Sequence, residues 1–308
     1  MIPAVTGPTG AGKTSVAAAL AEITNGAIIN ADSQSVYKYF NIGTSKPPAA
    51  MRKTITHYLV DFINPGEQFS AGDFVLGARR AIKKIRKNGK LPIICGGTGL
   101  YISALKDGIS PIPASSEIRD KIAKMTTAVQ LETLKKTDPE MYASIDKRNP
   151  RRVARALEIF RITGLPPTKA LKKNFIEGIP LKVFFLSMPR TELYRKIDER
   201  VEQMLEKGLV REVRRILEKG VAPGASAFSS IGYKEILEHI KGNVSLREAS
   251  EKIKFRTHLL ARKQEIWWRK KRAVKINVLG KNPMAISAEI VKILYNNELS
   301  SGEKQEDI

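Results

Sequence analysis

Gly7-Pro8-Thr9-Gly10-Ala11-Gly12-Lys13-Thr14 fits the phosphate-binding loop pattern G-x-x-x-x-G-K-[ST] at every fixed position. Glycines lack Cβ and can turn backbone N–H groups toward phosphate oxygens, Lys13 adds a positive charge, and the Thr14 hydroxyl is placed to ligate Mg²⁺. An apolar strand over 2–6 precedes the loop, and a helix over 14–24 directs its positive end at the same anion. The alternative, a glycine-rich turn that binds nothing, fits this context less well.

The residues on both sides of this loop alternate between apolar strands and amphipathic helices. Further strands are expected at 27–31, 58–63, 91–95, 181–186 and 274–278, and further helices at 70–88, 191–207, 209–219 and 245–268. Such alternation is typical of a parallel sheet, because parallel strands need a crossover connection that is usually a helix. The sequence therefore predicts an α/β fold of the P-loop type, with a parallel sheet flanked by helices.

A helical segment interrupts this alternation. Residues 108–114 form a turn-rich linker, and residues 115–173 show helical periodicity without a strand, most clearly over 150–163. We therefore predict a catalytic core over 1–109 and 179–280, an all-helical insertion domain over 110–178, and a C-terminal helix and polar tail over 281–308. The polar tail is expected to be disordered beyond Ser300.

The charge balance is unusual for a soluble enzyme. The 308 residues include 53 Lys and Arg against 31 Asp and Glu, which gives a formal net charge of +22. Such an excess implies a polyanionic partner, most simply nucleic acid. A basic amphipathic membrane surface is a second interpretation, but no strongly apolar face accompanies the charge. A solvated surface without a partner is the third.

The sequence argues against a secreted, membrane-spanning or metal-centred protein. Cys95 is the only cysteine, so no intrachain disulfide exists, and a reducing compartment, the cytoplasm, is expected. The immediate first strand leaves no room for a signal peptide, and no apolar run approaches the length of a membrane span. His57, His239 and His258 show no metal-ligand spacing.

Two segments that follow predicted strands carry polar groups. Asp32 follows the strand at 27–31, and Gly96-Gly97-Thr98-Gly99 follows the strand at 91–95. Ligands of an open parallel sheet bind beyond the carboxyl ends of its strands, so both segments are expected near the phosphate-binding loop. Asp32 fits a general base, a Mg²⁺ ligand or a helix cap. The glycine turn fits either a second ligand contact or a tight connection without a ligand.

Basic residues gather on two of the predicted helices. On the helix at 150–163, Arg151 and Arg155 are four residues apart and share an exposed face. From 252 to 275 there are ten Lys and Arg against one acid, with Phe255, Trp267 and Trp268 between them. These patterns fit phosphate contacts and base stacking, or else solvated helix faces with tryptophans in the core.

Taken together, these motifs resemble those of the tRNA dimethylallyltransferases, also called tRNA isopentenyltransferases. The matching segments are 7–14, 32–38, 42–47, 57–61, 96–101, 151–158, 231–234 and 262–264, and the resemblance covers about residues 2–280 in the right order. After Tyr37-Lys38 the family usually has Gly and, two residues on, Asp. Tyr39 and Asn41 stand at these positions here, so a different local loop shape is expected.

The resemblance implies a P-loop-type fold whose helical insertion grips the tRNA anticodon stem-loop. It implies transfer of a dimethylallyl group from dimethylallyl diphosphate to N6 of the adenosine immediately 3′ of the anticodon, with release of diphosphate and with Mg²⁺ as the cofactor. The loop would then hold a diphosphate leaving group rather than a nucleotide triphosphate. We expect a monomer that works without a membrane.

The resemblance also assigns residues. Asp32 matches the proton acceptor, Thr98 a residue beside the reacting groups, and Arg214 a diphosphate-binding arginine. Gly7, Thr9, Gly10, Ala11, Gly12, Lys13 and Thr14 match diphosphate-binding positions, with Thr14 also the metal ligand. The positions matching tRNA contacts are Ser33, Gln34, Ser35, Arg119, Arg151, Arg152, Arg155, Gly232, Tyr233, Lys234, Arg262, Lys263, Gln264, Trp268 and Arg269.

Two other functions remain open from the residues. A P-loop kinase or NTPase acting on a small substrate would use the basic insertion as a lid. An adenylate isopentenyltransferase would use a free nucleotide as the prenyl acceptor. The net charge of +22 and the basic insertion favour tRNA over a free nucleotide.

Overall fold

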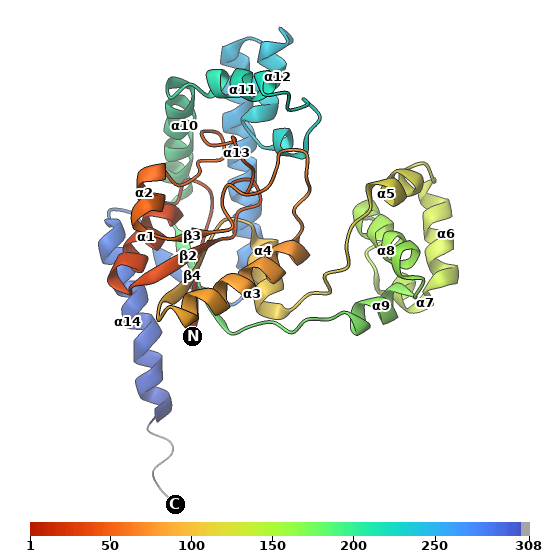
Figure 1. The fold of residues 1–308 in the computed structure, drawn as a ribbon, viewed down its shortest axis with the longest axis horizontal. Coiled ribbons are helices and arrows are strands. Elements are labelled where there is room, and N and C mark those ends of the chain that lie inside the picture. The colour runs from red at the N-terminus through yellow and green to blue at the C-terminus, as the bar shows by residue number, and fades with distance from the viewer. Residues whose placement is uncertain (303–308) are drawn as a thin grey trace, which may run out of the picture. The chain divides into compact units, whose positions relative to one another are not determined.

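The computed structural model describes residues 1–302, with side chains described up to 295, and divides into two compact units (Figure 1). The first unit comprises residues 1–70 and 74–106 and the chain from 180 onward. The second comprises residues 71–73 and 107–179. No helix in the described part of the chain is both long and apolar enough to cross a membrane.

The first unit is built on a parallel sheet of six strands within the described residues, in the order β3-β2-β4-β1-β5-β6. The strands are β1 (Ile2–Thr6), β2 (Gly26–Asn30), β3 (His57–Tyr58), β4 (Leu91–Cys95), β5 (Leu181–Ser187) and β6 (Val274–Asn277). Every pairing between them is parallel, which confirms the predicted α/β fold. β1 is central despite Pro3, because it pairs with both β4 and β5.

β3 is much shorter than the predicted extended run over 58–63. Leu59 and Asp61 have φ angles of 59° and 61°, in the left-handed region where a strand cannot continue. The Asp61 carboxylate is held there by the Lys46 ammonium at 2.7 Å and the Arg52 guanidinium at 3.2 Å. Lys46 is buried, so this ion pair fixes the backbone where β3 ends.

Helices cover the sheet and extend beyond it (Figure 1). Those that lie wholly or mostly in the first unit are α1 (Lys13–Ile23), α2 (Ala49–Thr54), α3 (Ala71–Lys87), α4 (Gly99–Asp107), α10 (Arg190–Glu206), α11 (Leu209–Glu218), α12 (Tyr233–Ile240), α13 (Leu246–Arg269) and α14 (Pro283–Gly302). α1 and α14 bury Leu20 and Ile290 in one cluster with strand residues such as Phe184. α2 and α12 were not predicted. α14 continues past Ser300, and residues 303–308 of the predicted disordered tail lie outside the described residues.

The second unit contains five helices within 107–179. They are α5 (Ser116–Ala123), α6 (Thr127–Thr137), α7 (Pro139–Ser144), α8 (Pro150–Thr163) and α9 (Pro167–Lys173). Side chains of Ser115, Thr126 and Asn149 cap α5, α6 and α8, as expected for residues whose oxygens can accept a first-turn N–H. Ile122, Leu134 and Leu157 form its own core. Ile109 and Ile176 close the unit through two backbone hydrogen bonds of 2.9 and 3.1 Å.

Tyr39, where the resembling family usually has glycine, adopts φ = 72°. This left-handed conformation is one that glycine favours and that costs another residue about 1–2 kcal/mol. The following N–H groups of Asn41 and Ile42 both donate to the Glu212 carboxylate, at 3.2 and 2.9 Å, and this anchors the segment. The tyrosine therefore takes a backbone shape suited to glycine.

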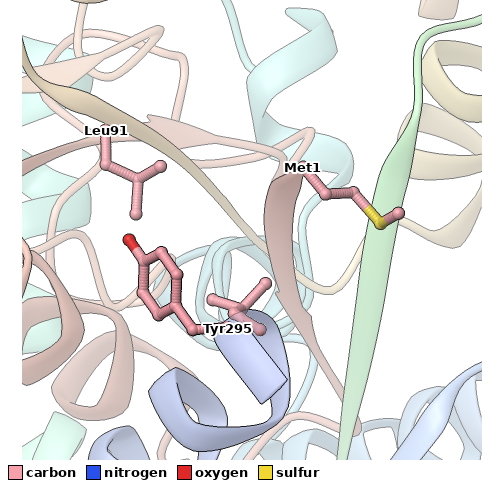
Figure 2. Close-up of a pocket in the computed structure, with 4 residues that line it drawn as sticks. Met1, Leu91 and Tyr295 are labelled. Atoms are coloured by element: carbon pink, nitrogen blue, oxygen red, sulfur yellow. The ribbon is translucent and has the colours of Figure 1, made fainter. Parts of the chain in front are cut away.

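A small cavity of about 70 Å³ lies where β1 and β4 begin, lined by Met1, Leu91, Leu294 and Tyr295 (Figure 2). The predicted ligand segments follow the carboxyl ends of the same strands. The cavity is therefore not the site expected from the sequence.

Candidate active site

The phosphate-binding loop connects β1 to α1. Gly10 and Gly12 have φ angles of 86° and 79°, which turn the backbone inward at a cost that only glycine avoids. No side chain caps α1, and its first turn contains no acidic residue. The first turn of α1 therefore carries no anion of its own that would compete with a phosphate group.

Lys13 is a half-buried cation within this loop. Its ammonium donates a hydrogen bond to the Pro8 carbonyl oxygen at 2.8 Å. The pKa of Lys13 is lowered to about 8, chiefly by desolvation and also by the positive charge of Arg200, while Cys95 and the Asp32 carboxylate oppose this shift. A partly desolvated ammonium with no carboxylate in direct contact is suited to an incoming anion.

Asp32 follows β2 and lies near this lysine. Its Oδ1 accepts hydrogen bonds from the N–H groups of Gln34 at 2.9 Å and Ser35 at 3.3 Å. Its charge acts on Lys13, Cys95 and Arg200 alike, so all four groups lie close together. Oδ2 has no hydrogen-bond partner among the described residues. One carboxylate oxygen thus caps the following turn, and the other is available for a proton.

Thr98 is tied to the Asp32 segment. Its hydroxyl accepts a hydrogen bond from the Ser33 N–H at 3.0 Å, and its N–H donates to the Ala31 carbonyl at 3.1 Å. The turn after β4 and the turn after β2 therefore lie side by side, as the strand order places them.

Asn30 supports the same segment, and the sequence reasoning missed it. Its buried amide donates to the carbonyls of Leu59 at 2.9 Å and Asp32 at 3.2 Å, and its oxygen accepts from the Ser35 hydroxyl at 3.1 Å. Its signal in the sequence was an amide at the end of an otherwise apolar strand.

Arg200 of α10, which sequence reasoning also missed, is the arginine beside Lys13 and Asp32. Burial lowers the pKa of Arg200 and the Asp32 charge opposes this, so the two charges interact across the candidate site. Arg214 lies on α11 with its side chain exposed, and no interaction joins it to Lys13 or Asp32 among the described residues. The structure therefore does not bring the predicted diphosphate-binding arginine to the loop.

The predicted tRNA contacts of the first unit fall into two groups. Lys234, Arg262, Lys263 and Arg269 are exposed, and Ser33 and Gln34 are half-buried. Tyr233 is 0% and Trp268 4% exposed, so their side chains belong to the core, while the neighbouring Trp267 is 39% exposed. The Tyr233 hydroxyl binds Glu212 and accepts from the Gly43 N–H at 3.1 Å, which shows a structural role. Ser35 and Gly232 are also buried.

In the second unit, buried Glu158 engages two of the predicted arginines. It contacts Arg155 at 2.7 Å and Arg119 at 3.0 Å, and it accepts from the Ser115 N–H at 2.8 Å. Burial raises the pKa of Glu158, but these partners outweigh it and hold the pKa below its usual range. Arg155 also donates to the Ile112 carbonyl at 2.6 Å, so it fastens the linker. Of the predicted exposed pair, Arg151 and Arg155, only Arg151 is exposed. The neighbouring Arg152 is exposed as well.

Metal-ligating side chains are sparse. No group of three or more His, Cys, Asp and Glu within the described residues could hold a metal ion. The Thr14 hydroxyl, in the first turn of α1, has no hydrogen-bond partner in that part of the chain. A Mg²⁺ ion here would therefore take most of its ligands from substrate phosphates and water, as this ion commonly does.

Known proteins that are similar in sequence or in structure are described as enzymes that transfer an isopentenyl or dimethylallyl group. The family model for IPP transferase matches residues 35–271. The tRNA dimethylallyltransferase of Thermomicrobium roseum is 41% identical over 282 residues, which cover 89% of this chain and 85% of that protein.

Solved structures agree. The tRNA delta(2)-isopentenylpyrophosphate transferase of Staphylococcus epidermidis has a TM-score of 0.71 at 32% identity, covering 96% of this chain and 99% of the other. A eukaryotic dimethylallyltransferase acting on tRNA has a TM-score of 0.81 at 27% identity, covering 99% and 81%.

Proposed function

Because the chain belongs to the tRNA dimethylallyltransferase family, we propose that it transfers a dimethylallyl group from dimethylallyl diphosphate to N6 of the adenosine 3′-adjacent to the anticodon. The observation that carries this proposal is the meeting of the phosphate-binding loop, Lys13, Arg200 and Asp32 beyond the carboxyl ends of the strands. An anion cradle beside a carboxylate suits a reaction in which diphosphate leaves and an amine loses a proton.

Each group has a role in that reaction. The adenine N6 attacks the allylic carbon while the bond between that carbon and the diphosphate oxygen breaks. The electron pair of the broken bond stays on diphosphate. Loop N–H groups, Lys13 and Arg200 stabilise the charge that gathers there. Asp32 accepts the N6 proton through Oδ2 while the Gln34 and Ser35 N–H groups hold Oδ1 in place. When bound, Mg²⁺ at Thr14 would supply further charge neutralisation to the leaving group.

The tRNA would approach through basic surface. The net charge of +22 favours a polyanion, and Arg262, Lys263 and Arg269 present exposed cations on α13. The target base must leave the anticodon-loop stack to reach Asp32, as in other enzymes that modify bases. We propose that the protein acts as a monomer, and we place the activity in the cytoplasm.

Prenyl transfer from labelled dimethylallyl diphosphate tests the function directly. We expect label in unmodified tRNA and none above background in AMP or ATP. Label in AMP or ATP alone would establish an adenylate isopentenyltransferase instead. Phosphate transfer from ATP to a small substrate, without prenyl transfer, would establish a kinase.

The affinity for diphosphate is expected to depend on pH through Lys13. Its pKa is about 8 without ligand, and a bound anion raises it, so binding takes up a proton above pH 8. Divided by the affinity of a Lys13→Arg variant, which cancels the titration of diphosphate itself, the wild-type affinity should be level below pH 8 and about tenfold weaker at pH 9 than at pH 7, by proton linkage. Calorimetric titration with inorganic diphosphate measures this. Lys13→Arg is the control, because arginine stays charged, and parallel profiles for the two proteins would contradict the assignment.

A further inference from the structure

We propose that Gln264 is a positioning residue that ties the phosphate-binding loop to the turn bearing Thr98, rather than a tRNA contact. The proposal rests on the function proposed above and concerns the same site. From the sequence, Gln264, Arg262 and Lys263 were all expected to contact tRNA. The proposal changes the role of Gln264 and keeps the expected role of the other two.

Both ends of the Gln264 carboxamide are engaged. Its Oε1 accepts a hydrogen bond from the Thr9 N–H at 2.8 Å, and its Nε2 donates to the Gly97 carbonyl at 2.9 Å. Gln264 is half-buried, whereas Arg262 and Lys263 are exposed. A neutral carboxamide offers an acceptor and a donor together, so one side chain bridges two backbone segments that a lysine or an ionised glutamate could not join in the same way.

Gly97 makes room for this bridge. A Cβ at that position would lie 2.4 Å from Gln264 Nε2, which is closer than real atoms approach, and 3.6 Å from Lys13 Nζ. The absence of a side chain at Gly97 therefore lets the carboxamide reach the carbonyl, close to the charged end of Lys13.

The bridge continues to the carboxylate. Gly97 adjoins Thr98, whose hydroxyl accepts from the Ser33 N–H at 3.0 Å, and Ser33 follows Asp32. One turn along α13, Trp267 packs against Gly99, where an added Cβ would lie 2.4 Å from its ring. α13 is thus fitted closely to this turn, and Gln264 links the diphosphate side of the centre to the proton-accepting side.

The distance between those two sides matters to the reaction. A misplacement of about 1 Å between reacting groups can cost about 100-fold in rate. Losing the bridge should therefore slow the chemical step more than it weakens tRNA binding, whereas losing a phosphate contact should do the reverse.

The test uses Gln264→Met, which keeps the side-chain length but removes both hydrogen bonds, in the full-length protein. We expect the single-turnover rate of prenyl transfer at saturating tRNA to fall at least tenfold, with the Kd for tRNA within threefold of wild type. Lys263→Met is the matched control on the same helix and should show the reverse order of losses. A tenfold weaker tRNA Kd with an unchanged single-turnover rate in Gln264→Met would overturn the proposal.

Gly97→Ala provides a second variant. The added Cβ would displace the Gln264 carboxamide from the Gly97 carbonyl without changing residue 264 itself. We expect it to reproduce the rate loss, and the double variant to lose little more, since both changes break one contact. Additive losses in the double variant would count against a shared contact.

Hydrogen exchange gives a readout that does not need prenyl transfer. The Thr9 amide should exchange at least tenfold faster in Gln264→Met than in wild type, and unchanged exchange would refute the bridge. If wild type itself fails to prenylate tRNA, the proposed function fails, and the Thr9 exchange still decides whether Gln264 holds the loop.

Discussion

Replacing Asp32 with asparagine is expected to lower the single-turnover rate of prenyl transfer by about 100- to 10,000-fold, the range for loss of a general base. Asparagine retains an oxygen that can accept from the Gln34 and Ser35 N–H groups, so the turn after β2 should keep its shape. It cannot take the N6 proton. The Kd for tRNA should therefore stay within threefold, as measured by filter binding beside rapid-quench kinetics.

Two further variants make the Asp32 result specific. Asp32→Ala removes the base and also the acceptor of the Gln34 and Ser35 hydrogen bonds, so it should also reduce the free energy of unfolding, by about 1 kcal/mol or more. Glu22→Gln removes an exposed carboxylate from α1 and should leave both the rate and the affinity as in wild type. A rate for Asp32→Asn within threefold of wild type would remove Asp32 from the base role.

Replacing Arg200 with alanine is expected to lower kcat/KM for dimethylallyl diphosphate by about 100- to 1,000-fold, as for the loss of one donor to a developing negative charge. The charge of Arg200 interacts with those of Lys13 and Asp32, so we expect its guanidinium to stabilise the charge that gathers on the leaving group. Steady-state kinetics with varied dimethylallyl diphosphate at saturating tRNA measure the effect. Arg200→Lys should recover only part of it, because an ammonium cannot bind two phosphate oxygens in a planar fork.

Arg214→Ala is the matched control for Arg200. Its side chain is exposed on α11, so kcat/KM for dimethylallyl diphosphate should change less than threefold. The opposite order, a large loss for Arg214→Ala and a small one for Arg200→Ala, would restore the assignment made from the sequence.

The sequence revealed the parts of this molecule that local patterns determine. The phosphate-binding loop carries its chemistry in consecutive residues, and the apolar runs of β1, β2, β4 and β5 distinguish them from the helices around them. Asp32 and Thr98 were placed near the loop because the carboxyl ends of parallel strands meet at one edge of the sheet. β3 was overextended because nothing in its composition shows that Leu59 and Asp61 turn left-handed.

Arg200 was harder to find from the sequence, because the orientation of each helix about its own axis decides which arginine faces the phosphate-binding loop. In α10 the buried side chains are Leu193, Ile197 and Val201, and Arg200 follows Ile197 by three residues and so lies near that face. On α11, Arg214 follows buried Val213 directly and therefore points elsewhere. Helical periodicity around Ile197 was the available signal. Gln264 and Thr9 are 255 residues apart, and no local pattern connects them.

The hydrogen bonds between Ile109 and Ile176 have a consequence for how this enzyme family can diversify. Because the chain enters and leaves the unit at these two residues, the helical segment between them can be lengthened, shortened or exchanged. The cost in loop-closure entropy is small, since it grows slowly with the length of the segment. The helical unit can thus vary between these two residues while the backbone hydrogen bonds that close it stay in place.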